Sequence, residues 1–131
     1  MRERALKVVM VLVGLLFVAG VYPILGNIRH PSPADTGDDM MLSLYVTLGV
    51  FLLLAVRNPA AHRSLIAFAA WSSFAHAVVM SALGLPLREE RTGFLIGSGV
   101  LVVIGVVLLA LLPGKPAPGL AAHVKAEALT R

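Results

Sequence analysis

The chain contains no cysteine, and this absence excludes several classes of site. Without thiols it can form no disulfide, no thiolate metal centre and no cysteine nucleophile. Four-helix thiol oxidoreductases that work with quinones are excluded for the same reason. Cysteine usage therefore gives no indication of the redox compartment.

Charged residues are also scarce. Only 14% of the 131 residues are charged and 58% are hydrophobic, with a mean hydropathy of +0.88. Soluble domains are about half apolar and a quarter charged, so this composition indicates that lipid is the solvent. The net charge of +4 favours contact with anionic lipid headgroups over nucleic acid, because the basic residues lie at the edges of apolar runs.

Four apolar runs are long enough, or nearly so, to cross a hydrocarbon core of roughly 30 Å. We expect spans at residues 5–25, 40–56, 64–85 and 94–112, which together make a single transmembrane domain over residues 1–113. The short connections between them predict an all-α, integral membrane four-helix bundle with antiparallel up-down neighbours. Residues 114–131 contain several prolines and are expected to form a mobile cytoplasmic tail.

Basic residues are distributed unequally along the chain. If the N-terminus is inside, the cytoplasmic segments hold eight of the 11 Lys and Arg, and the outer loops hold five of the seven acids. The positive-inside rule then predicts N-in and C-in. A cleaved signal peptide is the alternative, with Val18-Ala19-Gly20 as a weak cleavage site. The apolar run continues to Leu25, which favours an uncleaved first helix.

His76 and Tyr45 are the titratable residues that lie well inside the predicted spans. Ionisable groups at such depth are costly and rare, so each is a functional candidate. Thr47 falls at a similar depth in the second span, and antiparallel packing would bring it, with Tyr45, to the imidazole. The favoured interpretation is a neutral His76 satisfied by Ser72, Thr47 or a backbone carbonyl. The alternative is a ligand-binding cluster of His76, Tyr45 and Thr47.

No cofactor and no metal is expected, although haem, a quinone or an isoprenoid lipid remain alternative ligands of the cluster. Met80 lies one turn from His76 on the same helix face, so six-coordinate haem would need a second subunit. Proton-coupled export is disfavoured because every Asp and Glu lies in a loop or the tail. The outer loop residues His30, Asp35, Asp38 and Asp39 could gather a divalent cation, but solvation and helix capping explain them better.

The predicted inner loop carries a compact basic cluster made of Arg57, His62 and Arg63. We expect it to contact lipid headgroups, with a phosphate-bearing ligand or an acidic partner as the alternative. For helix packing, the third span offers small residues at every fourth position, and the fourth span offers a GxxxG pair, Gly93 and Gly97. The small residues are Ala69, Ser73, Ala77 and Ser81.

The chain reads MLSLYVTLG at residues 41–49, RNP at 57–59, HRSLI at 62–66 and AWSSFAH at 70–76. With these stretches the chain resembles a family of small bacterial membrane proteins known only as a domain of unknown function. The resemblance covers the four spans and implies a four-pass protein of the bacterial inner membrane, with no activity attached; the tail is expected to be peculiar to this chain.

Because no catalytic constellation is evident, the sequence favours a non-catalytic role over an enzyme. We expect an accessory or assembly subunit, whose partners are the lipid bilayer and either further copies of the chain or a larger membrane complex. The alternative is a binder of an apolar or redox ligand at the His76 cluster.

Overall fold

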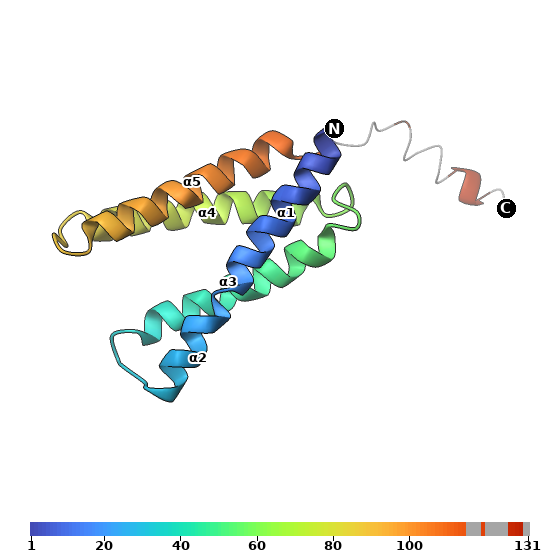
Figure 1. Ribbon diagram of the computed structural model, residues 1–131. Coiled ribbons are helices and arrows are strands. Elements are labelled where there is room, and N and C mark those ends of the chain that lie inside the picture. The colour runs from blue at the N-terminus through green and yellow to red at the C-terminus, as the bar shows by residue number, and fades with distance from the viewer. Residues whose placement is uncertain (115–118, 120–125, 130–131) are drawn as a thin grey trace.

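The computed structural model of the protein describes residues 1–114, 119 and 126–129. Its helices are α1 (Arg2–Val18), α2 (Val21–Arg29), α3 (Thr36–Ala55), α4 (Arg63–Gly84) and α5 (Arg91–Leu111) (Figure 1). The described residues contain no strand, which confirms the all-α prediction. Taking α1 and α2 as one stretch, four helical stretches are long and apolar enough to cross a membrane. The chain is therefore a membrane protein with transmembrane helices.

The expected tail falls largely outside the described residues. Between residues 114 and 131, the structure describes only Gly114, Gly119 and residues 126–129, which form one helical turn. The prediction of a mobile tail therefore stays a prediction.

The first predicted span is broken between α1 and α2, at Ala19 and Gly20. Pro23 explains the break, because it has no N–H to donate to the Ala19 carbonyl and its ring would clash with that carbonyl in a continuous helix. The Ala19 carbonyl instead accepts a hydrogen bond from the backbone N–H of Tyr22, at 3.0 Å. The other helices begin one to four residues before the predicted apolar runs, because their polar first turns are also helical.

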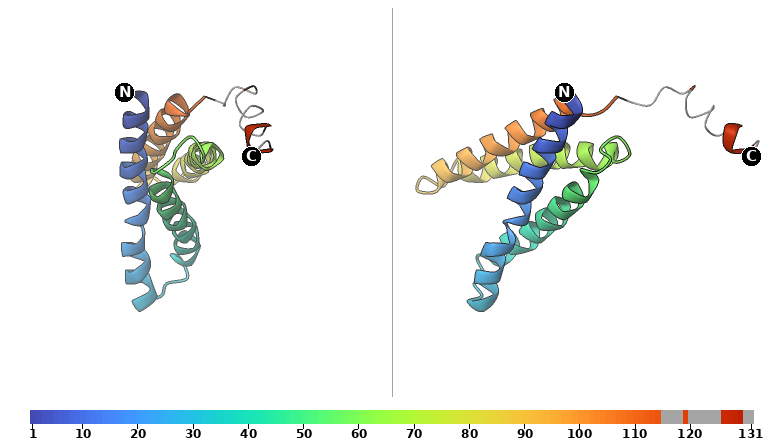
Figure 2. Two further views of the ribbon diagram at one scale, coloured as in Figure 1. Left: turned by 90° about the vertical axis from the view of Figure 1, so that its right-hand side faces the viewer. Right: turned by 45° about the vertical axis from the view of Figure 1, so that its right-hand side comes forward.

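The helices are arranged in two arms. In the α1–α3 arm, α1 and α2 pack on α3, and in the α4–α5 arm, α4 packs on α5. The arms converge where the N-terminus, the α3–α4 loop and the end of α5 lie together, and they diverge toward the α2–α3 and α4–α5 loops (Figures 1 and 2). We refer to these as the convergent end and the far ends of the arms.

The hydrophobic core lies near the convergent end, where all the spanning helices contribute to it. Its side chains come from α1, the second half of α3, the first turns of α4 and the last turns of α5. They are Leu6, Met10, Val13, Phe17, Leu48, Leu52, Ala55, Ile66, Ala69, Ala70, Ile104 and Leu108. The far halves of α3, α4 and α5 contribute no buried residue to this cluster. A cleft lies between the arms there, lined by residues that include Met41, Met80 and Gly97.

Glycines set the close packing inside each arm. In the α1–α3 arm, a Cβ on Gly49 would lie 2.7 Å from the carbonyl oxygen of Gly14, so the two backbones are in direct contact. In the α4–α5 arm, a Cβ on Gly105 would lie 3.0 Å from the carbonyl oxygen of Ala70. Such small residues allow helices in lipid to approach closely and gain van der Waals contact.

The small-residue face of α4 behaves as its spacing predicts. Ala69, Ser73 and Ala77 are buried and Ser81 is half-buried. The GxxxG pair of α5 is used only in part. A Cβ on Gly97 would meet the Met80 side chain, whereas one on Gly93 would meet nothing within 4 Å.

The pairing of helices differs in one respect from what the short loops suggested. The α3–α4 connection was expected to hold its two helices together as close neighbours, but α3 and α4 contact each other much less than each contacts its own arm partner. The glycine contacts account for the preference, because they let α3 approach α1 and α4 approach α5 more closely than larger residues allow.

Candidate functional site

Tyr45 lies where the two arms begin to diverge, and it contacts both. It comes from the middle of α3, and its ring lies 5.3 Å from the ring of His76 on α4, tilted by 56°. On its other side it makes an edge-to-face contact with Phe17 of α1, at 4.9 Å between centroids. The Tyr45 hydroxyl donates a long hydrogen bond, 3.3 Å, to the backbone carbonyl of Ser72. Tyr45 therefore connects α1, α3 and α4 at the mouth of the cleft.

Thr47, the third residue of the predicted cluster, does not join the other two. It is exposed, and its hydroxyl donates to the Ser43 carbonyl of its own helix at 2.9 Å. The reason is helical geometry, because two residues separated by one position point about 200° apart around a helix. The structure therefore brings together Tyr45 and His76 but leaves Thr47 on the opposite side of α3.

The ring nitrogens of His76 have no hydrogen-bond partner among the described residues. The two side chains expected to satisfy the imidazole are engaged elsewhere, since Thr47 donates to Ser43 and the Ser72 hydroxyl donates to the Ala69 carbonyl at 3.1 Å. An unpaired polar group in a low-dielectric setting costs about 1–3 kcal/mol. The half-buried imidazole is thus available to a molecule that enters the cleft.

A cavity of about 290 Å³ lies against the Tyr45 and His76 side chains. These two are the polar side chains of its wall, and the remainder of the wall is apolar. The other lining residues are Leu16, Phe17, Gly20, Met41, Leu42, Met80, Gly97, Val100 and Leu101. Sites for small apolar molecules have this composition, with a few polar groups fixing the orientation of the bound molecule.

Sequence reasoning missed the contribution of α1 to this cavity. Leu16 and Phe17 of α1 line it, together with Gly20 at the break before α2. Nothing in the sequence of α1 distinguishes Leu16 and Phe17 from its other apolar residues, so no local signal would have found them. Phe17 becomes a site residue only because the Gly14–Gly49 contact brings α1 against α3.

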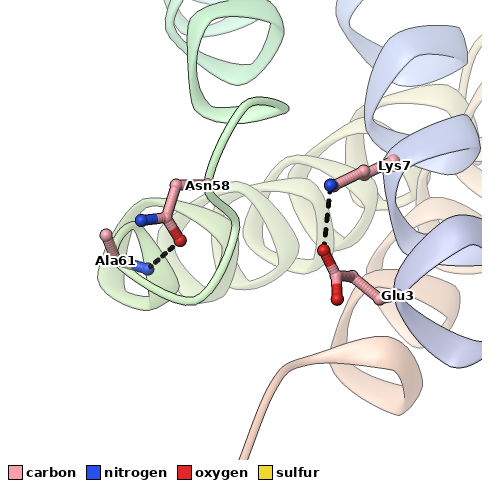
Figure 3. Close-up of polar contacts among 4 residues, drawn as sticks. All are labelled: Glu3, Lys7, Asn58 and Ala61. Atoms are coloured by element: carbon pink, nitrogen blue, oxygen red, sulfur yellow. Dashed lines mark hydrogen bonds and ion pairs between the residues drawn. The ribbon is translucent and has the colours of Figure 1, made fainter.

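The basic cluster of the α3–α4 loop lies at the convergent end. Arg57 and His62 are exposed, whereas Arg63 is half-buried and its Nη1 atom has no hydrogen-bond partner among the described residues. The loop folds on itself, because the side-chain oxygen of Asn58 accepts a hydrogen bond from the backbone N–H of Ala61 at 3.3 Å (Figure 3). Arg57 and His62 therefore lie exposed on one short loop, and Arg63 follows as the first residue of α4.

The start of α1 strengthens the positive character of this end. The Arg2 guanidinium donates to the carbonyl oxygens of Ala110 at 2.7 Å and Leu112 at 3.3 Å, and so connects the N-terminus to the end of α5. Lys7 pairs with Glu3 at 2.9 Å on the exposed surface of α1 (Figure 3). A pocket of about 380 Å³ lies between the start of α1, the end of α5 and the α3–α4 loop.

The acidic residues near the α2–α3 loop lie at the start of α3, with Asp35 just before the helix and Asp38 and Asp39 in its first turn. Asp39 accepts a hydrogen bond from the Asn27 side chain at 3.0 Å, which connects α2 to α3. Within the described residues, no group of three or more His, Asp or Glu side chains lies close enough to hold a metal ion. The structure thus assigns Asp39 a contact between two helices.

Comparison with known proteins places the chain in a family context. A family model described as a family of unknown function, DUF6632, matches residues 2–126. The match includes much of the tail, so the expectation that the tail is peculiar to this chain is wrong. Comparisons with curated proteins and with solved structures found no match.

Proposed function

Since the chain belongs to DUF6632, a family of unknown function, we propose from its geometry that it is a non-catalytic multi-pass membrane protein that binds an apolar or redox ligand between its two arms. A haem, a quinone and an isoprenoid lipid are the ligand classes under consideration. His76 and Tyr45 would provide the polar contacts, and the surrounding α1, α3, α4 and α5 side chains would enclose the apolar part.

The free imidazole of His76 is the observation that carries this proposal. From the sequence alone a structural histidine was favoured, because Ser72 and Thr47 were available to satisfy it. In the structure both hydroxyls donate to backbone carbonyls of their own helices, and neither ring nitrogen of His76 is bonded within the described residues. A polar group left unpaired at membrane depth favours a binding role over a structural one.

We further propose that the convergent end faces the cytoplasm of a bacterial-type cell, with the chain in the inner membrane. Support comes from the excess of Lys and Arg at this end and the excess of acids at the far ends. In this orientation Arg57, His62 and Arg63 lie at the level of anionic headgroups, where each basic residue contributes about 1 kcal/mol of attraction. Lipid contact is thus their proposed role.

An accessory or assembly subunit is the second candidate. It is favoured by Gly93 on α5, which faces open space and lies about one turn from the exposed apolar side chain of Ile96. Such a surface suits close packing against a neighbouring helix, from a further copy of the chain or from another subunit. This role would not depend on His76.

The test is the content of protein purified in a mild detergent. The absorption spectrum and the mass spectrum of extracted small molecules are recorded for wild type, His76→Ala and Thr47→Ala. We expect a defined apolar molecule in wild type and in Thr47→Ala, which serves as the matched control on the opposite side of α3. In His76→Ala its amount should fall about fivefold or more, as expected for the loss of a hydrogen bond.

Two results would contradict ligand binding. One is a protein that carries no small molecule in any form. The other is equal amounts of the same lipids in all three proteins, which indicates nonspecific detergent or membrane lipid. Either result would favour the accessory role, for which chemical cross-linking in native membranes would identify the partner subunit.

A further inference from the structure

We propose that the ligand is a neutral, lipid-soluble molecule of the quinone class, with its carbonyl-bearing ring between Tyr45 and His76 and its tail along the groove between α1 and α5. This inference rests on the proposed binding function and specifies the chemical class and the orientation of the ligand. It follows from the shape of the cleft, from the charges that its wall lacks, and from the type of side chain around its polar end.

A second space adjoins the cavity at Tyr45 and His76. A groove of about 410 Å³ lies between α1 and α5, and Leu16 and Val100 line both spaces. The walls of this groove are entirely apolar, and it runs toward the convergent end past Val103 and Ile104. One end of the combined space therefore offers polar contacts and the other offers only apolar surface, which matches a molecule with one head and one tail.

The head must be uncharged. The lining residues of the two connected spaces include no Lys, Arg, Asp or Glu. Tyr45 lies near the middle of α3, so the head would sit roughly 14 Å from either end of that helix, at a rise of 1.5 Å per residue. A phosphate or carboxylate at this depth would be desolvated without a counter-charge, at a cost of several kcal/mol. Phospholipids and isoprenoid phosphates are therefore disfavoured.

The polar groups point to hydrogen-bond acceptors on the head. A neutral imidazole carries one N–H and a phenol carries one O–H, so His76 and Tyr45 can each donate one hydrogen bond. The Tyr45 hydroxyl gives up little in turning to a ligand, since its bond to the Ser72 carbonyl is long at 3.3 Å. Carbonyl oxygens on a ring would accept both hydrogen bonds, whereas a plain hydrocarbon would leave the His76 N–H unused and Tyr45 on its long bond to Ser72.

The side chains around the polar end suit a flat ring. Phe17, Met41 and Met80 line the cavity beside Tyr45 and His76. Thioether sulfurs make favourable contacts with ring edges, and aromatic rings stack or meet edge to face. Haem fits less well, because Met80 is on the same helix as His76, one turn away, and cannot occupy the opposite axial position.

Photo-crosslinking of protein in lipid nanodiscs tests the orientation. The probe is a benzoquinone with an alkyl tail that carries a diazirine near its far end. Two comparison probes carry the same tail with a trimethylammonium head or with no head. We expect the quinone probe to label residues 12–16 and 99–104, and excess untagged quinone to reduce this labelling about fivefold or more. The comparison probes should label the lipid-facing sides of all helices without competition.

Two variants separate the head from the tail. His76→Ala removes a head contact and should lower the competed labelling about fivefold, as expected for one hydrogen bond. Gly99→Leu fills the tail groove, and a side chain there is tolerated because a Cβ on Gly99 would meet nothing within 4 Å. It should abolish labelling at residues 103 and 104. Gly93→Leu, which also faces open space but lies outside both spaces, is the matched control and should label as wild type does.

The outcomes distinguish this inference from the proposed function. Labelling in the α1–α5 groove that excess quinone and His76→Ala both reduce supports the quinone inference and the proposed function together. Labelling outside the groove that excess quinone and His76→Ala both reduce overturns the placement of the tail. Equal labelling by the trimethylammonium probe overturns the ligand class. Ligand binding stands in both cases. If neither excess quinone nor His76→Ala changes the labelling, the quinone inference is overturned. The extraction experiment on detergent-purified protein then decides independently whether any other molecule binds.

Discussion

The contact between Gly14 and Gly49 should be the most sensitive point of the α1–α3 arm. In Gly49→Ala the new Cβ would lie 2.7 Å from the Gly14 carbonyl oxygen, 2.8 Å from the Phe17 Cβ and 3.0 Å from the Val18 backbone nitrogen. Two of these atoms are backbone atoms, so no side-chain rotation can relieve the clash. The helices must separate by roughly 0.7 Å to restore ordinary contact, which forfeits a quarter or more of the neighbouring dispersion energy.

We expect Gly49→Ala to lower the free energy of unfolding by about 2 kcal/mol, within the range of about 1–3 kcal/mol for overpacked sites. Gly93→Ala is the control, because it makes the same chemical change in a helix where the Cβ meets nothing within 4 Å. Helix propensity favours alanine in both variants by up to about 1 kcal/mol, and less for Gly93 because it lies in the first turn of α5. The difference between the variants therefore understates the cost of the clash.

Denaturation by sodium dodecyl sulfate in mixed micelles, followed by circular dichroism, measures both variants. The reasoning predicts a clear loss of stability for Gly49→Ala and none for Gly93→Ala. If the two variants differ by less than about 0.5 kcal/mol, the two helices do not touch at Gly14 and Gly49 and the proposed packing of the arm is wrong.

Three other predictions concern separate parts of the chain. Ser98 is 4% exposed and its hydroxyl lacks a hydrogen-bond partner among the described residues, so Ser98→Ala should raise the free energy of unfolding by about 1 kcal/mol; a loss of stability would refute this. Arg2→Gln should cost about 1 kcal/mol in the same assay by releasing the end of α5, whereas Arg4→Gln should cost nothing measurable. Because the chain has no cysteine, Glu89→Cys should react with an impermeant maleimide in intact bacteria, and Ala60→Cys only after permeabilisation; the opposite pattern would reverse the proposed orientation.

Much of the fold could be predicted from the sequence because the signal is strong for long apolar runs. The four predicted spans each overlap one helical stretch that is long and apolar enough to cross a membrane. The break at Ala19 and Gly20 was not predicted, although Pro23 marked it, because the apolar run continues through the proline. Hydropathy measures how well a residue dissolves in lipid, and it carries little information about a local change of helix direction.

The arrangement of the helices was harder to predict, since lipid solvates every apolar face equally well. Without a hydrophobic force between helices, their pairing depends on contacts such as Gly14 with Gly49 and Gly105 with Ala70. No rule of spacing indicates which partner a glycine such as Gly49 or Gly105 meets. The short α3–α4 loop suggested a close pair, and the glycine contacts outweigh it.

The candidate site could be predicted in part. His76 and Tyr45 stood out because titratable residues are rare inside spans, and the structure brings their rings to 5.3 Å. Thr47 was grouped with them by depth along the membrane, which ignores direction around the helix. The hydrogen bond from Thr47 to Ser43 shows the consequence, because a hydroxyl on the other side of α3 satisfies itself on its own backbone.

The position of the core gives the strongest reason to look for a ligand in the cleft. The buried cluster ends near Phe17, Leu48, Ala70 and Ile104, so beyond these residues the two arms have few interactions with each other. Tyr45 and His76 lie at this boundary, where packing within the chain stops and the imidazole is left without a partner among the described residues. In the proposed function, an apolar molecule with a hydrogen-bonding head would supply both the packing and the acceptor that this boundary lacks.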